Sequence, residues 1–493
     1  MKSYNALETT FERLHHLKHL ESITYWDQAA MMPSNSNEAR SKAMAEYGVL
    51  LHQLMVDPKV GELINKAEGE DLNEVQQASL REMKRRYDLS TWVPEDLVKA
   101  KSLAGSKCEH AWRTQRTNND WKGFLENFKE VLNLSRQEAK VLSEKSGLSP
   151  YDSLIGLYEP GMNTKNLDRI FGDVKAWLPG LIQEIVEKQK TRKVLKPEGS
   201  FSVEKQKDLG LKVMAKLGFD FTRGRVDISS HPFCGGVPED VRMTTRYDEN
   251  DFVKALMGIV HETGHARYEQ NLPEQLRVLP VGRARSMGIH ESQSLFFEMQ
   301  LGRGSAFLKS IHQDIVASFG ASQAFEIENL INIYRQVKPD FIRVDADEVT
   351  YPAHIILRYE IEKALIGGEI EARDIPDMWN EKMMSYLGVD TRDNFQQGPL
   401  QDIHWTDGSF GYFPSYTLGA MYAAQEFNAV KKECPQIESH IEKGDYSPAF
   451  NWLKKNIWSQ ASLHTTDDLM LKATGETLNP VYLKNHLIER YLN

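Results

Sequence analysis

Residues 251–271 read DFVKALMGIVHETGHARYEQN, and this stretch places two histidines four residues apart. In an α-helix, His261 and His265 lie on the same face, about one turn from each other. Two imidazoles in this arrangement can bind one Zn²⁺, and Glu262 can then reach a water on the metal without ligating it. The segment therefore predicts a helix that carries a metal site with its own candidate general base.

The residues before the first histidine are strongly apolar, which indicates that this helix is buried. Burying two histidines and a glutamate costs several kcal/mol unless they have partners, and a metal ion supplies that partnership. Gly264 lies inside the same helix, although glycine costs about 1 kcal/mol relative to alanine there. A bare Cα at this position would let another chain segment or a substrate approach closely. The alternative is a solvated helix face with two histidines, and the apolar context favours the metal.

A catalytic zinc needs a third protein ligand and keeps one coordination position open for water. The next candidate segment, RARSMGIHESQSLFFEMQLGR (283–303), predicts a second buried helix. It offers three candidate ligands, Glu291, His290 and Glu298. We favour Glu291 because a carboxylate offsets more of the metal charge. The alternative is that Glu291 is an early helix residue favoured only by the helix dipole.

The composition is that of a large globular protein, with 493 residues, 41% hydrophobic and 26% charged. The net charge of −10, without a long basic tract, argues against nucleic acid and anionic membranes as partners. No run of about 18 apolar residues occurs, so no membrane-spanning helix is expected. Cys108, Cys234 and Cys434 are odd in number and form no CxxC motif, which is typical of a reducing cytosol. We therefore expect a cytoplasmic protein.

Helical periodicity covers most of the chain, with apolar residues three and four apart. Residues 221–250 differ, because their glycines, prolines and short β-prone runs predict one or two short strands with loops. No repeat or linker is visible, so we expect a mainly α-helical fold in a single catalytic unit, 1–493. Helices are predicted at 11–26, 37–56, 73–89, 94–115, 122–146, 167–189, 203–217, 251–270, 287–303, 308–316, 321–337, 353–366, 415–432, 449–458, 466–473 and 479–491.

The order HETGH and then HESQS resembles the pattern of the carboxypeptidase Taq family of HExxH metallocarboxypeptidases. The resemblance covers essentially the whole chain. It implies Glu291 as the third ligand, Glu262 as the general base, and a two-lobed helical fold with a deep central cleft and a small β element near the active site. That fold is similar to those of angiotensin-converting enzyme and neurolysin. The other matching motifs are WDQAAMMP (26–33), YEPGM (158–162), HPF (231–233), DVRMT (240–244), IRVDAD (342–347) and GPLQDIHW (398–405).

The resemblance further implies a metal-dependent carboxypeptidase that releases C-terminal amino acids from peptides with broad specificity, and a homodimer. Zn²⁺ suits a site of two histidines and a glutamate, and Co²⁺ can occupy the same site. The segment 401–419, QDIHWTDGSFGYFPSYTLG, resembles the part of the angiotensin-converting enzyme fold where a histidine and a tyrosine bind the substrate carbonyl. We assign this role to His404 and Tyr412, with Tyr416 as the alternative.

An exopeptidase must also recognise the free C-terminal carboxylate, which suits a bidentate arginine. Arg343 is the first candidate and Arg242 is the second. Each could instead pair with a nearby aspartate, Asp345 or Asp240. We expect DVRMTTRY (240–247) to form an edge strand along the cleft, to which a peptide could add by main-chain hydrogen bonds. Two other functions stay open: a zinc endo-oligopeptidase of the same fold, and a helical binding scaffold with a structural metal.

Overall fold

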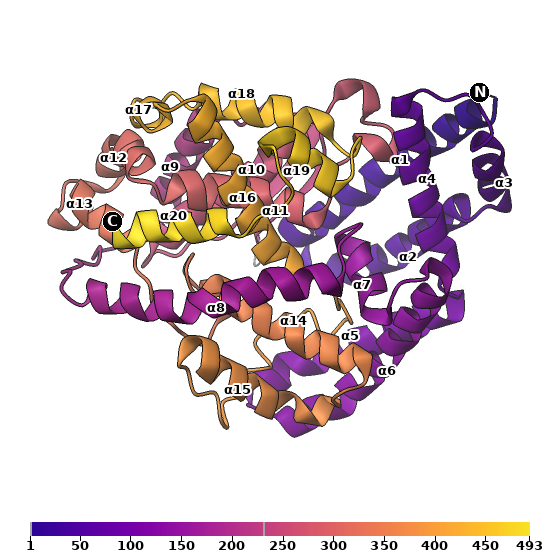
Figure 1. Cartoon of the computed structure of the whole chain (residues 1–493), viewed down its shortest axis with the longest axis horizontal. Coiled ribbons are helices and arrows are strands. Elements are labelled where there is room, and N and C mark those ends of the chain that lie inside the picture. Colours follow the sequence, from indigo (N-terminus) through magenta and orange to yellow (C-terminus); the bar gives the residue numbers. More distant parts are fainter. Residues whose placement is uncertain (1, 230–231) are drawn as a thin grey trace.

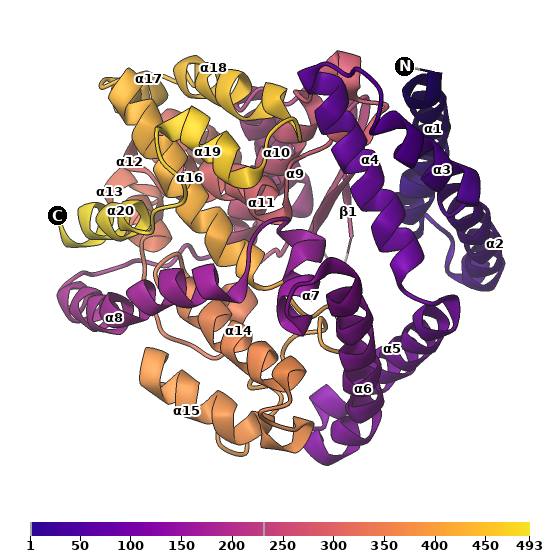
Figure 2. The same ribbon diagram turned by 45° about the vertical axis from the view of Figure 1, so that its right-hand side comes forward.

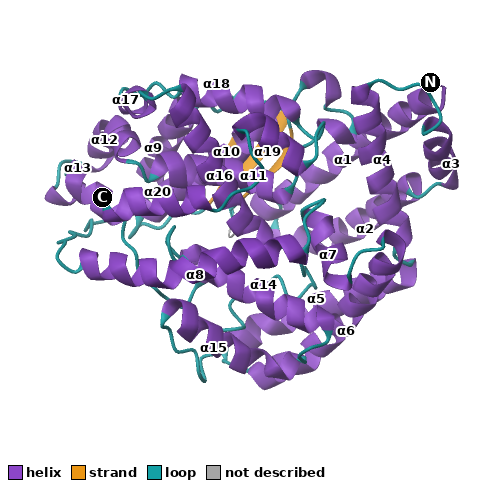
Figure 3. Cartoon of the chain, in the orientation of Figure 1, coloured by secondary structure: helices purple, strands orange, loops and turns teal. Residues whose placement is uncertain are grey.

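Helices account for most of residues 2–229 and 232–493, the part of the chain that the computed structural model describes (Figures 1 and 3). The mainly α-helical fold expected from the sequence is thereby confirmed. The first helices are α1 (Lys2–Ala30), α2 (Asn37–Met55), α3 (Pro58–Ala67), α4 (Glu74–Trp92), α5 (Glu95–Thr117), α6 (Trp121–Ser146), α7 (Pro150–Tyr158), α8 (Thr164–Gln189) and α9 (Val203–Lys216). They are followed by α10 (Phe252–Gln270), α11 (Met287–Leu295), α12 (Ser305–Phe319), α13 (Ile327–Tyr334), α14 (Tyr351–Gly367), α15 (Ile375–Leu387), α16 (Pro414–Glu433), α17 (Ile437–Glu442), α18 (Ser447–Asn456), α19 (Thr466–Thr474) and α20 (Val481–Leu492).

Four helices, α3, α7, α15 and α17, were not expected from periodicity. They have between 6 and 13 residues, so each offers few repeats of the helical pattern. The helix expected at 287–303 is split, because α11 ends at Leu295 and a π-helical segment, Phe296–Gly302, continues it. The helix expected at 321–337 is likewise shorter and consists of a 3₁₀ turn at Gln323–Phe325 followed by α13.

Buried residues from every helix between α5 and α20 join one large hydrophobic cluster. A second, smaller cluster holds the N-terminal helices α1–α4 together and includes Leu279 and Val281. Figure 2 shows α1–α4 along one side of the molecule, next to the rest of the fold. The helices α10, α11 and α16 lie in the large cluster, so the candidate site is built on packed, rigid elements. Within the described residues, none of the helices has the length and apolarity needed to cross a bilayer.

The β element is a three-stranded sheet of β1 (Gly224–Ile228), β2 (Phe233–Val237) and β3 (Asp240–Thr245). The strand order is β1-β3-β2, with β1 parallel and β2 antiparallel to β3. The expectation of an edge strand at DVRMTTRY is therefore wrong, because β3 pairs on both sides. The reason is that β2 forms a hairpin with one edge of β3, while β1 pairs with the other edge of β3. The outer strands are β1 and β2, and His231 of the HPF motif lies outside the described residues.

The sheet leads directly into α10. Asp251 caps this helix, because its side chain accepts hydrogen bonds from the main-chain N–H groups of Val253 and Lys254. Buried residues of the sheet, Val241 and Met243, pack with Ile259 of α10 in a third hydrophobic cluster. The cap thus fixes where α10 begins, and the packing of Ile259 against the sheet fixes how the helix is rotated about its axis. Together they set the direction in which His261 and His265 point.

Candidate active site

The two histidines of α10 and the glutamate of α11 converge on one point. One ligand atom from each of His261, His265 and Glu291 lies within 4.8 Å of the other two. The Oε2 atom of Glu291 is 3.4 Å from Nε2 of His265 and 4.0 Å from Nε2 of His261. Ligand atoms around a tetrahedral zinc ion lie about 3.3 Å apart, given bonds of about 2.0–2.1 Å. Donor types and spacings therefore fit a divalent metal ion.

Glycines let the elements of this cluster approach closely. A Cβ added to Gly264 on α10 would come within 2.4 Å of the main-chain oxygen of Gln293 on α11. A Cβ added to Gly419 on α16 would come within 2.7 Å of Cγ of Glu291. The close approach that Gly264 predicted is present, and the approaching group is a chain segment. Together the two glycines hold Glu291 between α10 and α16.

Glu298 holds the far side of the first histidine. Its Oε2 atom lies 3.0 Å from Nδ1 of His261, and Arg303 donates to its other oxygen at 2.8 Å. Glu298 belongs to the π-helical segment, a geometry that recurs at functional sites. A carboxylate on Nδ1 fixes the tautomer and leaves Nε2 to face Glu291. Glu298, a candidate third ligand in the sequence, thus lies behind His261 in the structure.

His290 has the same relation to the second histidine. Its Nδ1 atom is 2.6 Å from Nδ1 of His265, and its Nε2 atom is 2.8 Å from Oε1 of Glu269. An ionised carboxylate only accepts hydrogen bonds, so His290 donates from Nε2. Its Nδ1 then accepts the Nδ1 proton of His265, which leaves Nε2 of His265 free for a metal. The other candidate third ligand, His290, therefore also lies behind a histidine.

Negative charge is in excess around this cluster. Burial would lower the pKa of His261, but the hydrogen bond to Glu298 and the charges of Glu291 and Glu262 raise it to about 10. Burial lowers the pKa of His265 to about 4, so this imidazole is neutral at neutral pH and can act as a ligand. A divalent cation offsets the excess charge, which is a second reason why these residues fit a metal.

Glu262 lies beside the cluster and is only 7% exposed. Its Oε2 atom is buried without a hydrogen-bond partner among the described residues. Burial raises the pKa of Glu262 to about 7. A buried carboxylate oxygen without a partner costs free energy, so a role that involves a proton or a water molecule explains its retention.

Aromatic residues of the 401–419 segment form a wall near Glu291. The rings of His404 and Tyr412 stack with centroids 5.4 Å apart, and Tyr416 packs edge-on against Tyr412. Burial raises the pKa of Tyr412 and of Tyr416, and the charge of Glu291 adds to both shifts. Both hydroxyls are therefore protonated donors near Glu291. Burial lowers the pKa of His404 to about 4, so its imidazole is neutral as well.

Arg343 is held in place by an ion pair that was not expected. Its Nη2 atom lies 2.8 Å from Oδ1 of Asp402, and its Nη1 atom donates to the hydroxyl of Tyr351 at 3.1 Å. Arg358 binds the other oxygen of Asp402 at 2.6 Å. Two arginines thus share one aspartate and keep one net positive charge. Asp345, the partner that its position in the sequence suggested, pairs with a lysine of α10 instead.

Arg242, the second candidate for the substrate carboxylate, has two partners of its own. It donates hydrogen bonds to both carboxylate oxygens of Asp240, at 2.5 and 2.7 Å. Asp240 is the partner that the sequence offered as the alternative to a substrate carboxylate. Its guanidinium also lies 4.4 Å from the ring centroid of Trp26 on α1. These contacts tie the β hairpin to the first helix. Arg343 is therefore the stronger of the two candidates.

Nearly the whole chain, residues 6–491, matches the family model of the carboxypeptidase Taq (M32) metallopeptidases. The chain belongs to the M32 family. Carboxypeptidase 1 of Bacillus subtilis is 36% identical over 98% of this chain and 96% of its own length. Thermostable carboxypeptidase 1 of Thermus thermophilus is 37% identical over 96% of this chain and 94% of its own length. The solved structure of Trypanosoma cruzi metallocarboxypeptidase 1 has a TM-score of 0.99 and 46% identity, with 100% of both chains covered.

Membership of M32 confirms the resemblance that the ordered motifs suggested, and this M32 chain is a metal-dependent carboxypeptidase. The site residue that sequence reasoning missed is Asp402, which lies inside the GPLQDIHW motif. A signal for it existed, because Arg358 lies in the apolar stretch IILRY (355–359) and a buried arginine needs a carboxylate. The roles of Glu298 and His290 behind the histidines had no such signal, since both depend on how α10 and α11 cross.

Proposed function

We propose that this M32 enzyme releases C-terminal amino acids from peptides with broad side-chain tolerance, using Glu262 as the general base. The observation that carries this proposal is the unpartnered Oε2 atom of Glu262 beside the cluster of His261, His265 and Glu291. A structural metal site has no use for a buried free carboxylate next to its ligands. A hydrolytic site needs one to accept a proton from water.

His261, His265 and Glu291 would hold the metal, with Zn²⁺ as the proposed ion and Co²⁺ as an alternative. When bound, such an ion acts as a Lewis acid and makes water acidic enough to lose a proton near neutral pH. Glu262 accepts that proton as water attacks the peptide carbonyl carbon. Glu262 then delivers the proton to the leaving amine, so the carboxylate is regenerated in each cycle.

The developing oxyanion needs donors that are already in place. The neutral His404 and the protonated hydroxyl of Tyr412 can supply two, with Tyr416 as the alternative to Tyr412. Donors of this kind are worth about 2.7–4 kcal/mol each in a water-excluded site. Stacking of the two rings holds them in one geometry, so little reorganisation is needed when charge develops.

We assign the C-terminal carboxylate of the substrate to Arg343. The pair of arginines around Asp402 keeps one net positive charge, which a substrate carboxylate can neutralise. The guanidinium lies 5.1 Å from the ring centroid of Tyr416, so it borders the aromatic wall of the site. Broad tolerance would follow if the rest of the peptide adds to the outer edge of β2 by main-chain hydrogen bonds.

The Glu262→Gln variant tests the mechanism. It should bind one metal ion per chain, measured by mass spectrometry of the dialysed protein, and lose at least about 10²-fold in kcat on blocked dipeptides. The matched control is Glu274→Gln, an exposed position just after α10, which should keep full activity. Full activity in Glu262→Gln would contradict the proposal. The same metal analysis decides between Zn²⁺ and Co²⁺.

An amidated peptide tests how the substrate is recognised. A carboxypeptidase that binds the free carboxylate should cleave the acid at least about 10²-fold faster than its C-terminal amide. Equal rates on both would favour an endo-oligopeptidase mode of action in this fold. The homodimer and the cytoplasmic location stay predictions. Light scattering after size-exclusion chromatography checks the first.

A further inference from the structure

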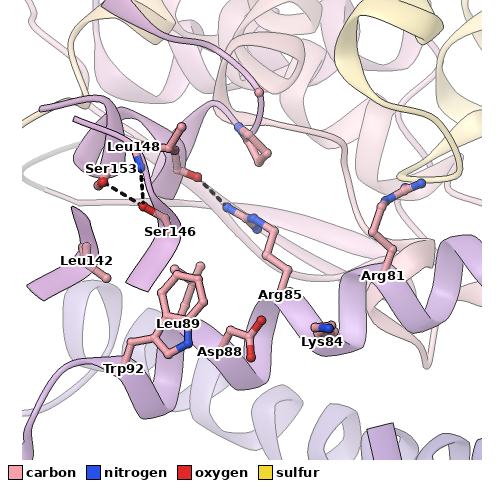
Figure 4. Close-up of a pocket in the computed structure, with 13 residues that line it drawn as sticks. Arg81, Lys84, Arg85, Asp88, Leu89, Trp92, Leu142, Ser146, Leu148 and Ser153 are labelled. Atoms are coloured by element: carbon pink, nitrogen blue, oxygen red, sulfur yellow. Dashed lines mark hydrogen bonds between the residues drawn. The ribbon is translucent and has the colours of Figure 1, made fainter. Parts of the chain in front are cut away.

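Two of the cavities outside the metal site lie beside α4 and are lined by several positive side chains, and they differ in whether those side chains have partners. The first, of about 340 Å³, lies between α4, α6 and α7 (Figure 4). Its cations already have partners: Arg85 donates to the main-chain oxygens of Gly156 and Leu157, and Lys84 pairs with Glu68. With Arg81 paired to Glu82, every positive side chain of this cavity therefore has a partner within the protein.

The second cavity, of about 420 Å³, lies between α1, α4, β2 and the end of α10. Lys18, Arg86 and Arg283 line it, one from α1, one from α4 and one from the segment before α11. Within the described residues, none of these three side chains forms a hydrogen bond or an ion pair. Burial and the two arginines lower the pKa of Lys18 to about 8, which shows that the three cations repel one another.

The acidic groups near the cavity offset this charge only from a distance. Glu21 acts on Lys18, Glu82 acts on Arg86 and Glu269 acts on Arg283 through their charges, but none of them forms an ion pair with these cations. The remaining arginine of the cavity, Arg277, is paired with Glu239 at 3.0 Å. Lys18, Arg86 and Arg283 are partly buried and line one cavity without a direct ion pair, so their N–H groups are free to bind an anion. Two guanidinium groups and an ammonium suit a carboxylate or a phosphate.

The cavity adjoins the active site. Residues 234–238 of β2 and the following turn line it, and the charge of Glu262 acts on the thiol of Cys234. Glu269 lies one helical turn beyond His265 on the same helix. Within the described residues the outer edge of β2 pairs with no other strand. A peptide that adds to this edge would therefore pass the cavity.

We propose that this cavity is a subsite for an acidic side chain of the substrate on the N-terminal side of the scissile bond. The inference rests on the proposed function, because a carboxypeptidase removes one residue and all other substrate residues lie upstream. Lys18 and Arg283 bind the carboxylate of that side chain, and Arg86 adds a third positive charge to the cavity wall. The enzyme tolerates many residues but is fastest on peptides with aspartate or glutamate at one upstream position.

The test uses N-acetylated five-residue alanine peptides that carry aspartate, asparagine or lysine at one upstream position. The wild-type enzyme should show kcat/KM about 10-fold higher or more for aspartate than for asparagine at one position. The Lys18→Gln/Arg283→Gln variant should reduce this ratio below about 2-fold and leave the asparagine peptide unchanged. Lys18→Glu should also reduce the aspartate preference, because it places a carboxylate beside the two remaining arginines. The control Arg13→Gln removes an exposed cation from the same helix and should keep the wild-type ratio.

Stability and free phosphate provide two further measurements. Lys18→Gln removes one of three repelling cations, so its Tm should equal or exceed that of the wild type. Phosphate that raises the wild-type Tm but not that of Lys18→Gln, without any aspartate preference, would show that the occupant is a free anion and overturn the substrate subsite. An equal loss on the aspartate and asparagine peptides would overturn it too, because the cavity would then hold the terminal carboxylate. Failure of the proposed function is distinguishable, since no peptide of the series would be cleaved.

Discussion

The Cα atom of Gly264 lies against the main chain of α11, so that an added Cβ would come within 2.4 Å of the carbonyl oxygen of Gln293. We expect Gly264→Ala to push the two helices apart, and such overpacking costs about 1–3 kcal/mol. Metal affinity should fall as well, because the crossing places Glu291 against the histidines. Chemical denaturation and a metal titration measure the two effects. Gly258→Ala, on the same helix with nothing within 4 Å, should be neutral or gain up to about 1 kcal/mol.

The hydrogen bond that His261 donates to Glu298 should matter for metal retention. Glu298→Gln removes the charged acceptor on Nδ1, and losses of this kind weaken metal binding about 10–100-fold. Competition with a chelator measures the affinity. The control is Glu328→Gln at an exposed position of α13. An unchanged affinity in Glu298→Gln would show that the orientation of His261 is fixed by packing alone.

The hydroxyl of Tyr412 should act in the reaction and not in folding. Tyr412→Phe keeps the ring that stacks on His404, so stability and metal content should stay close to wild type. Loss of an oxyanion donor should lower kcat by about 10²–10³-fold. Steady-state kinetics on a blocked dipeptide checks this, with Tyr386→Phe on α15 as the control. A normal kcat in Tyr412→Phe would indicate that Tyr416, and not Tyr412, is the oxyanion donor.

The shared aspartate predicts a pH dependence of stability. Burial would raise the pKa of Asp402, but Arg358 and Arg343 hold it well below its ordinary value. A depressed folded pKa means that the stabilisation is present above the unfolded pKa of about 3.9 and is lost as the pH falls below it. Asp402→Asn should lose about 3–5 kcal/mol at pH 7, because two buried arginines lose their counter-charge.

Denaturation at pH 7 and pH 3 tests this dependence. The gap between the wild type and Asp402→Asn should narrow at pH 3, since the wild type loses part of its ion-pair stabilisation there. The control is Asp390→Asn, which breaks an exposed pair with Arg392 and should change stability by no more than about 1 kcal/mol. A constant gap at both pH values would mean that Asp402 contributes mainly through packing.

Much of the candidate site could be predicted from the sequence because its signals are local. The spacing of His261 and His265 fixes their common helix face, and Glu262 follows from the same periodicity. The HESQS motif supplied Glu291, and the structure brings it to the histidines. Short helices and the strand order were not predicted, because pairing partners of a strand are chosen by tertiary contacts. The central position of β3 is the clearest example.

The sequence by itself determined the helical fold, the metal-binding type of site and the place of Glu262 beside the two histidines, since each rests on residues within one or two helical turns. Only the tertiary structure decided which groups lie behind the histidines, which aspartate binds Arg343, and which cations are left without a partner. Lys18, Arg86 and Arg283 come from three separate segments, and nothing in any one segment indicates the others. Charges interact through space with an energy set by distance and burial, and both quantities exist only once the chain is folded.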